Sequence, residues 1–200
     1  MKIGIDIDEV IAEYLKNFLE YLSSKKGIYI DYSDIKDYNS LSNVLGIDDE
    51  KVGDLIIDHT NNTLALLELE LIEGSLEAIN FLDDNHEIYF ITSRHPSNKI
   101  KTIDFFKKHF PNKNFKIIFS GDAWGGNKSK AEICLEIGCD FIIEDNSVYA
   151  KECASNGIKV ILFDKPWNKL EKPTKNIFRV RGWKEAIDKI NKFELRQNVE

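Results

Sequence analysis

The sequence predicts an α/β fold: a doubly wound parallel sheet with a small helical cap inserted after the first strand. Two observations lead to this fold class. Short apolar runs of strand length alternate with segments of helical spacing along most of the chain, and strands that alternate with helices pair in parallel. One long interval near the start of the chain has no convincing buried strand, and it is too long for a simple crossover, so we interpret it as an insertion.

Six apolar runs, each bounded by turn residues, account for the predicted strands. They span residues 2–5, 88–91, 115–119, 141–143, 159–163 and 177–180. Helical spacing precedes three of these runs, with apolar side chains at Leu76, Ile79 and Leu82, at Ile100, Ile103 and Phe106, and at Ile133 and Ile137. We therefore expect helices on both faces of a parallel sheet.

The inserted interval is predicted to be helical. A first helix is indicated by the spacing of Ile11, Leu15, Phe18, Leu19 and Leu22, which stops at the polar stretch 23–27. A second helix follows residues 48–50, Asp-Asp-Glu, which supply a cap and an acidic first turn. A third segment, 64–71, returns the chain to the sheet. We divide the chain into a core of 1–11 and 74–200 and a cap of 12–73.

Composition excludes several classes of protein. The chain has 200 residues, is 42% hydrophobic, and carries a formal net charge of −7, which disfavours long nucleic acid and anionic membranes as partners because both bind clustered Lys and Arg. Its three cysteines match neither a disulfide scaffold nor zinc spacing, and no stretch has the length of a membrane span or signal peptide. We expect a cytoplasmic protein; the sequence does not decide between a monomer and a homodimer.

Acidic pairs follow two of the predicted strands. Asp6 and Asp8 come directly after the first run, and Glu144 and Asp145 come directly after the fourth. In an open parallel sheet, ligands bind beyond the carboxyl ends of the strands. One acidic strand end is common and is often only solvated loop, but two in one chain indicate a shared site.

Hydroxyl and basic side chains are expected at the same edge. Thr92 and Ser93 follow the second predicted strand and are suited to phosphate oxygens, and Arg94 is a candidate anion contact. Lys130 lies near the start of a predicted helix, where the helix dipole also attracts an anion. Lys128 is the alternative to Lys130, since both lie close to this helix start.

Together these side chains suit the transfer of a phosphoryl group to a carboxylate. A phosphate ester repels an anionic nucleophile, so an Asp can attack it only when a divalent cation and a Lys neutralise the developing charge. Mg²⁺ prefers oxygen ligands, which Asp6, Asp145 and the backbone carbonyl of Asp8 would supply. Asp8 would then protonate the leaving oxygen and activate water in the second step.

The order of these motifs resembles that of the haloacid dehalogenase-like (HAD) phosphatases, whose small helical cap also follows the first motif. The resemblance implies a role for each matching residue. Asp6 is the nucleophile, Asp8 the general acid and base, Thr92 a phosphate contact, Lys130 the neutralising cation, and Asp145 the last Mg²⁺ ligand, supported by Glu144.

Two segments are similar to the 5'(3')-deoxyribonucleotidase family. They are residues 6–14, Asp-Ile-Asp-Glu-Val-Ile-Ala-Glu-Tyr, and residues 162–168, Leu-Phe-Asp-Lys-Pro-Trp-Asn. Tyr14 occupies the position of an aromatic residue that stacks on the nucleobase in that family; alternatively, it packs inside the cap beside Phe18. The chain differs from the family in having Glu9 where Gly is usual and no Trp in the cap interval. We expect Trp167 to pack a loop against the sheet edge.

The functional hypothesis is an Mg²⁺-dependent phosphomonoesterase that forms an aspartyl-phosphate, with nucleoside monophosphates as the first substrates to consider. A sugar phosphatase is one alternative, and a non-catalytic phosphate-binding or receiver-like regulatory protein is another. A receiver carries its acceptor Asp after the third strand and has no long insertion after the first, which disfavours that class here. The acidic net charge disfavours a 3'-phosphatase that acts on nucleic-acid ends.

Overall fold

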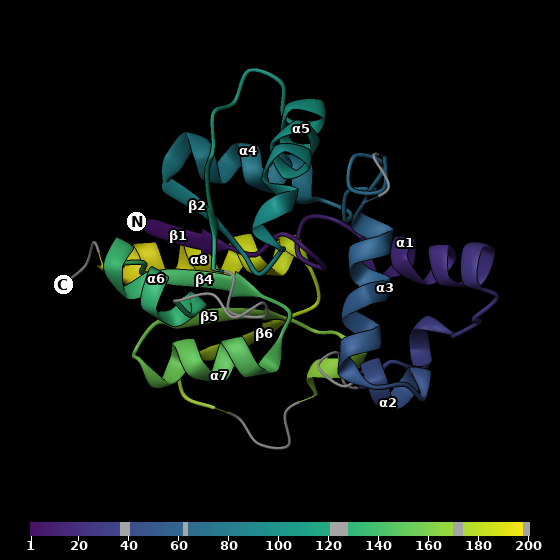
Figure 1. Cartoon of the computed structure of the whole chain (residues 1–200). Helices are drawn as coiled ribbons and strands as arrows, with labels where there is room; N and C mark the ends of the chain where they lie inside the picture. Colours follow the sequence, from purple (N-terminus) through teal and green to yellow (C-terminus); the bar gives the residue numbers. More distant parts are fainter. Residues whose placement is uncertain (37–40, 62–63, 121–127, 170–173, 198–200) are drawn as a thin grey trace.

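A computed structural model describes residues 1–36, 41–61, 64–120, 128–169 and 174–197. Within them lies a six-stranded, all-parallel sheet in the order β3-β2-β1-β4-β5-β6 (Figure 1). The strands are β1 (Lys2–Ile5), β2 (Glu87–Thr92), β3 (Lys116–Phe119), β4 (Phe141–Glu144), β5 (Lys159–Phe163) and β6 (Ile177–Val180). The predicted sheet is confirmed, and β1 lies where the strand order changes direction, the usual place for a ligand site.

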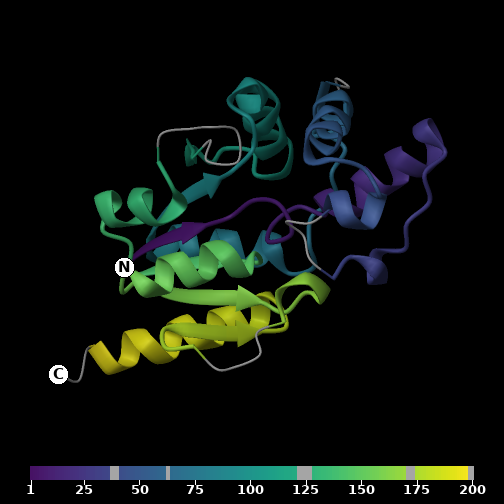
Figure 2. The same ribbon diagram turned by 60° about the horizontal axis from the view of Figure 1, so that its bottom comes forward.

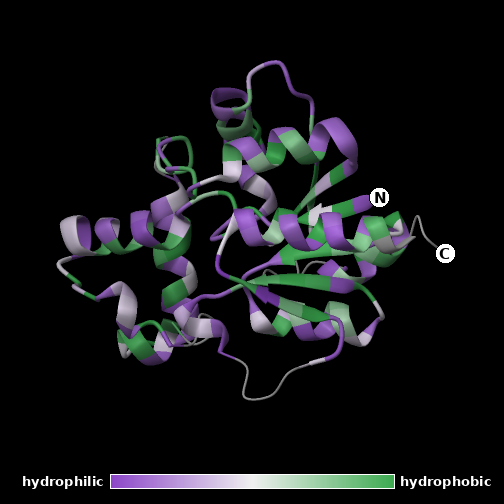
Figure 3. Cartoon of the chain, turned by 180° about the vertical axis from the view of Figure 1, so that it is seen from behind, coloured by the Kyte–Doolittle hydropathy of each residue, from purple (hydrophilic) through white to green (hydrophobic). Residues whose placement is uncertain are grey.

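Helices cover both faces of the sheet. On one face lie α4 (Ser75–Asn85), α5 (Lys99–His109) and α8 (Trp183–Gln197), and on the other lie α6 (Lys130–Ile137) and α7 (Ser147–Ser155). Successive strand side chains point to opposite faces, so Ile3 and Ile5 join the first core while Ile142 joins the second. Figure 3 shows the hydrophobic strands between helices of mixed polarity.

Gly4, in the middle of β1, lies against side chains of β2 and α6. A Cβ atom at this position would lie 3.1 Å from Ile91 Cδ1 and 3.5 Å from Cys134 Sγ, which belongs to α6. The first of these separations is tighter than ordinary van der Waals contact, so a side chain here would push the neighbouring residues apart. The absence of a side chain at Gly4 thus leaves room for the Ile91 side chain of β2.

The inserted helices lie beyond the carboxyl ends of the strands, as the arrowheads in Figure 2 show. They are α1 (Tyr14–Tyr21), α2 (Leu41–Leu45) and α3 (Asp49–Asn61), with a π-helical turn η1 (Leu22–Lys26) and a 3₁₀ turn η2 (Tyr32–Asp34). Helical structure after the first strand is therefore confirmed. The α-helix ends at Tyr21, but the polar stretch that was predicted to stop it continues as the π-helical turn η1 through Lys26, and Gly27 then ends the helical segment in the left-handed region at φ +68°.

Two chain connections run side by side between the inserted helices and the sheet. Ala12 forms an antiparallel bridge with Leu71, and the backbone N–H of Glu13 donates to the carbonyl of Glu70 at 2.9 Å. Two 3₁₀ turns, η4 (Pro96–Asn98) and η6 (Pro166–Asn168), follow β2 and β5. In the described part of the chain, no helix combines the length and the apolar character that a membrane span requires.

Candidate active site

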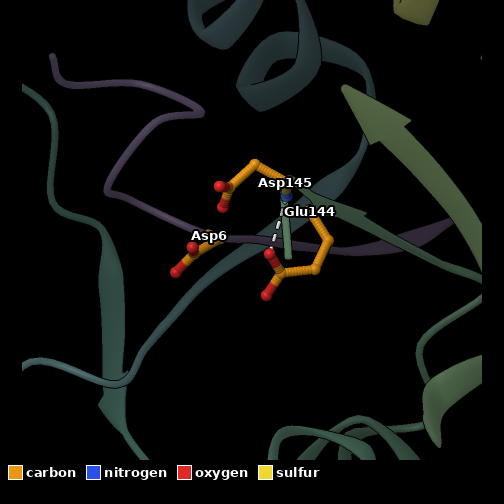
Figure 4. Close-up of side chains that lie close together, drawn as sticks. All are labelled: Asp6, Glu144 and Asp145. Atoms are coloured by element: carbon orange, nitrogen blue, oxygen red, sulfur yellow. Dashed lines mark hydrogen bonds between the residues drawn. The ribbon is translucent and has the colours of Figure 1, made fainter. Parts of the chain in front are cut away.

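The register of the sheet brings the two acidic pairs together. Ile5 of β1 pairs with Ile143 of β4, and the Asp6 N–H donates to the Ile143 carbonyl at 3.0 Å. As a result, Asp6 emerges beside Glu144 and Asp145, as Figure 4 shows. All three side chains are buried, and their potential ligand oxygens lie within 4.8 Å of one another.

Lys130 is the basic side chain that reaches this acidic cluster. A capping box formed by Ser129 and Glu132 starts helix α6, so Lys130 occupies its first turn. The Lys130 Nζ lies 2.8 Å from Asp6 Oδ1 and 2.5 Å from Glu144 Oε1, and the side chain is 1% exposed. Lys128, the alternative considered above, forms a surface ion pair with Glu136 instead.

Glu144 organises the cluster through hydrogen bonds. Its Oε1 accepts from Lys130 Nζ, and its Oε2 accepts from the backbone N–H groups of Asp145 at 2.6 Å and Asn146 at 2.8 Å. The side chain of Asn146 in turn caps helix α7. Because Glu144 is committed to these bonds, Asp6 and Asp145 are the better candidates for binding a cation.

The cluster places more negative than positive charge in a buried space. Burial, offset in part by Lys130, raises the pKa of Asp6 to about 7. Burial and the charge of Glu144 raise the pKa of Asp145 well above its usual range. For Lys130, the charges of Asp6 and Glu144 outweigh the effect of burial and raise the pKa, so the side chain remains cationic. Buried anions require a partner, and these oxygen donors suit a hard divalent cation.

The side chain of Asp8 lies against Arg94 instead of joining the three clustered acids. Arg94 donates from Nε to Asp8 Oδ2 at 2.9 Å and from Nη2 to Oδ1 at 2.6 Å, a bidentate pair. Its Nη1 also donates to Thr102 Oγ1 at 3.2 Å. Arg94, a candidate anion contact in the sequence, thus binds an anion of the chain itself.

Thr92 and Ser93 differ in their surroundings. Thr92 ends β2 and is buried, and its Oγ1 accepts the backbone N–H of Arg94 at 3.2 Å. Ser93 lines the cavity above the acidic cluster, and its Oγ lies 3.2 Å from Ser120 Oγ. Of the two hydroxyl groups, that of Ser93 has the more direct access to a bound ligand.

A cavity of about 360 Å³ lies between the inserted helices and the carboxyl edge of the sheet. Its polar wall comes from the core and includes Asp6, Asp8 and Lys130. Its apolar wall comes from the inserted helices and includes Val52 and Ile56 of α3. A cavity with charged side chains on the core side and apolar side chains on the side of the inserted helices suits a small ligand with an anionic end and a less polar body.

Tyr14 both packs within the inserted helices and lines this cavity. Its ring stacks on Phe18 with centroids 6.0 Å apart, and its Oη lies 3.4 Å from His59 Nδ1. His59 Nε2 lies 2.8 Å from Asn17 Oδ1. Burial lowers the pKa of His59 to about 4, so this imidazole is neutral near pH 7. The packing of Tyr14 against Phe18 is observed. Because Tyr14 also lines the cavity, it is placed where it could contact a substrate.

Two aromatic residues have contacts in the site that the sequence did not predict. Trp167 was expected to pack a loop against the sheet edge; its side chain is indeed buried in the core beside sheet residues, and in addition it donates its Nε1–H to Asp145 Oδ2 at 2.8 Å, which was not expected. The need of a buried indole N–H for an acceptor was the available signal. Tyr149 lines the cavity, with Lys130 Nζ 4.6 Å from its ring centroid, and no spacing in the sequence indicated it.

The position where the resembling family usually has Gly has a left-handed backbone. Glu9 has φ +61°, a conformation that glycine adopts more readily than other residues. Its carboxylate accepts the backbone N–H of Leu15 at 2.7 Å and the ammonium of Lys165 at 3.2 Å. These bonds account for a Glu at this position, since they hold the chain where it leaves the site for α1.

The fold is that of the HAD-like hydrolases. The structure is similar to a HAD-hydrolase of Bacillus subtilis bound to magnesium, with a TM-score of 0.64 and 17% identity over 95% of this chain and 98% of that one. It is also similar to a haloacid dehalogenase-like hydrolase of Streptococcus pneumoniae, with a TM-score of 0.68 and 13% identity over 94% of this chain and 97% of that one. At these identities the likeness shows the fold.

The sequence comparisons identify the family within this class. The family model for 5' nucleotidase, deoxy (pyrimidine), cytosolic type C protein matches residues 1–197, and the chain belongs to this family. It is 26% identical to a 5'(3')-deoxyribonucleotidase of Bacillus subtilis over 197 residues, 94% of this chain and 97% of that protein. It is 30% identical to a nucleotidase of Clostridium acetobutylicum over 135 residues, 66% of each. The resemblance stated above is confirmed: the chain is a HAD-type nucleotidase, a phosphoric monoester hydrolase.

The neutral His59 predicts a pH-dependent loss of stability. The unfolded chain takes up a proton on this histidine near pH 6.5, but the folded chain does so only near pH 4. Acidification between these values therefore favours unfolding, by up to about 3 kcal/mol at its lower end. In urea unfolding over this pH range, His59→Gln should lose less stability than the wild type. Parallel curves for the two proteins would contradict the assignment.

Proposed function

We propose that the chain is an Mg²⁺-dependent phosphomonoesterase that hydrolyses nucleoside monophosphates, with deoxyribonucleotides first, through an aspartyl-phosphate on Asp6. The observation that carries this proposal is the position of Asp6, which contacts Lys130, lies beside the Glu144–Asp145 pair and lines the cavity. The family of the chain and the names of its relatives support a nucleotide as the substrate.

Asp6 and Asp145, with the backbone carbonyl of Asp8, are the proposed Mg²⁺ ligands. These residues suit Mg²⁺ because the buried carboxylates carry more negative charge than Lys130 alone can balance. A similar HAD-hydrolase bound to magnesium supports the choice of ion. When bound, Mg²⁺ supplies the positive charge that lets a phosphate ester approach an aspartate.

Asp6 is the proposed nucleophile. One of its carboxylate oxygens attacks phosphorus while the bond from phosphorus to the ester oxygen breaks, which leaves a phosphorylated Asp6. Lys130 remains cationic and neutralises charge on the phosphoryl oxygens. The hydroxyls of Ser93 and Thr92, both at the end of β2, are proposed to donate to the same oxygens.

Asp8 is the proposed general acid and base. In the first step it gives a proton to the leaving oxygen, and in the second it takes a proton from the water that attacks phosphorus. The second attack breaks the bond between phosphorus and Asp6 and releases phosphate. Arg94 donates two hydrogen bonds to the Asp8 carboxylate, which orient it at the edge of the cavity. To act as the acid, Asp8 would carry a proton and release one of these two bonds; the ionised, Arg-paired form is the one suited to act as the base.

We also propose that residues 12–73 act as a cap domain on a core of 1–11 and 74–200. The cap would exclude water and contact the leaving group, and Tyr14 and Val52 are its proposed contacts because both line the cavity. The net charge of −7 supports free nucleotides as substrates over long nucleic acid. The word cytosolic in the family's description supports a cytoplasmic location.

The proposal is tested by a phosphatase screen on metal-free protein. Deoxyribonucleoside and ribonucleoside monophosphates, sugar phosphates and small acid phosphates are each assayed with Mg²⁺ and with a chelator. We expect hydrolysis of nucleoside monophosphates that the chelator abolishes and Mg²⁺ restores. Preferential turnover of sugar phosphates, or turnover that the chelator leaves unchanged, would contradict the proposal.

Asp6→Asn is the control variant for this screen. Because the amide cannot act as the nucleophile, turnover should fall by at least about 10³-fold on every substrate that the wild type accepts. Burial raises the pKa of Asp6, which means that the ionised carboxylate is unfavourable in the folded chain without metal. Because the substitution removes this carboxylate, the melting temperature without metal should equal or exceed that of the wild type. A large drop in melting temperature would show that the lost activity reflects misfolding.

Arg94→Lys tests whether Arg94 serves Asp8 or the substrate. Lysine keeps the positive charge but cannot form the bidentate bond to Asp8. We expect kcat to fall by about 10²-fold, within the range of general acid and base catalysis, while KM for the nucleotide stays within a few-fold of the wild type. Steady-state kinetics would refute this role if KM rose and kcat were unchanged, since Arg94 would then bind the phosphate.

A further inference from the structure

A loop that follows β5 holds both the side chain and the backbone of Asp145. The Nε1–H of Trp167 donates to Asp145 Oδ2 at 2.8 Å, and the Nδ2–H of Asn168 donates to the Asp145 carbonyl at 2.5 Å. Both donors are buried, with Trp167 5% and Asn168 1% exposed. We propose that Trp167 is a positioning residue that orients Asp145 for Mg²⁺ binding, an inference that rests on the proposed function.

The indole is held rigidly enough for this task. Asn168 anchors the turn η6, because its Nδ2 also donates to the Phe163 carbonyl and its Oδ1 accepts the N–H of Lys165 at 3.1 Å. The ring of Tyr32 meets the Trp167 ring in a T-shaped contact with centroids 5.5 Å apart, and Lys165 Nζ lies 5.7 Å from the ring centroid. With its turn anchored and its ring packed on two sides, Trp167 presents its N–H in a fixed direction.

Asp145 needs such a donor because its neighbours are negatively charged. Its carboxylate lies buried beside Asp6 and Glu144, and like charges repel one another strongly where water is excluded. The bond to Oδ2 fixes the plane of the carboxylate and thereby the direction of Oδ1. Hydrogen bonds to metal ligands commonly change metal affinity by about 10- to 100-fold. Trp167 therefore determines how well Asp145 serves as a ligand.

Trp167→Phe removes the N–H and keeps an aromatic ring, and Trp183→Phe is its matched control. Trp183 is also buried, at 2% exposed, and donates its Nε1–H to the carbonyl of Val10 at 2.9 Å. Both variants lose a buried indole hydrogen bond, so a general loss of stability should affect them alike. Only Trp167→Phe removes a bond to a proposed metal ligand.

Calorimetric titration of metal-free protein with Mg²⁺, without substrate, measures the effect. We expect Trp167→Phe to raise the Mg²⁺ dissociation constant at least about 10-fold and Trp183→Phe to leave it within about twofold of the wild type. The inference is overturned if Trp167→Phe binds Mg²⁺ as tightly as the wild type, or if both variants lose affinity equally. A wild type that binds no Mg²⁺ would instead overturn the proposed function on which the inference rests.

A second measurement separates positioning from damage to the site. Because Asp6 and Asp145 remain in Trp167→Phe, saturating Mg²⁺ should restore kcat on a nucleotide to within a few-fold of the wild type, with the activation curve displaced to higher Mg²⁺. Failure of excess Mg²⁺ to restore kcat would contradict a role through the metal ligand.

Discussion

The site depends on one buried interaction, the contact of the Lys130 ammonium with Asp6 and Glu144. Three elements distant in sequence must meet for it to form: β1, the start of α6, and β4. The parallel register sets Asp6 beside the β4 acids, and the capping box starts α6 at Lys130. Since one ammonium cannot balance three buried carboxylates, the arrangement is built for a further cation. Without that cation, the buried carboxylates destabilise the folded chain, and functional sites commonly lower the stability of a protein in this way.

Much of the fold was predictable because its signals are local. The strands of a doubly covered sheet are continuous apolar runs, and the ends of β1, β5 and β6 were predicted to the residue. Helix faces were less certain. Ile100 was expected to lie with Ile103 and Phe106, yet it is 73% exposed; α5 buries Phe106 as expected, together with Thr102 and Phe105. The apolar spacing of that helix is short, and tertiary packing decides which of its faces meets the sheet.

The meeting of acidic side chains was predictable where they follow directly on a strand end, as for Asp6, Glu144 and Asp145. The site was not predictable where a partner is chosen by tertiary packing. Lys128 and Lys130 are equivalent in the sequence, and the capping geometry of α6 distinguishes them. The bidentate bond of Arg94 to Asp8 spans 86 positions, and the bond of Trp167 to Asp145 spans 22. Hydrogen bonds between residues so far apart in the sequence produce no periodic pattern from which they could be predicted.

The proposed chemistry requires a divalent cation held by Asp6, Asp145 and the backbone carbonyl of Asp8, and anomalous diffraction tests this requirement most directly. A crystal of the wild-type protein grown with Mn²⁺ in place of Mg²⁺ should give one strong anomalous peak within coordination distance of Asp6 and Asp145, with Lys130 still beside Asp6. A map without density between these two aspartates, or with Mn²⁺ bound only at the surface, would contradict the account.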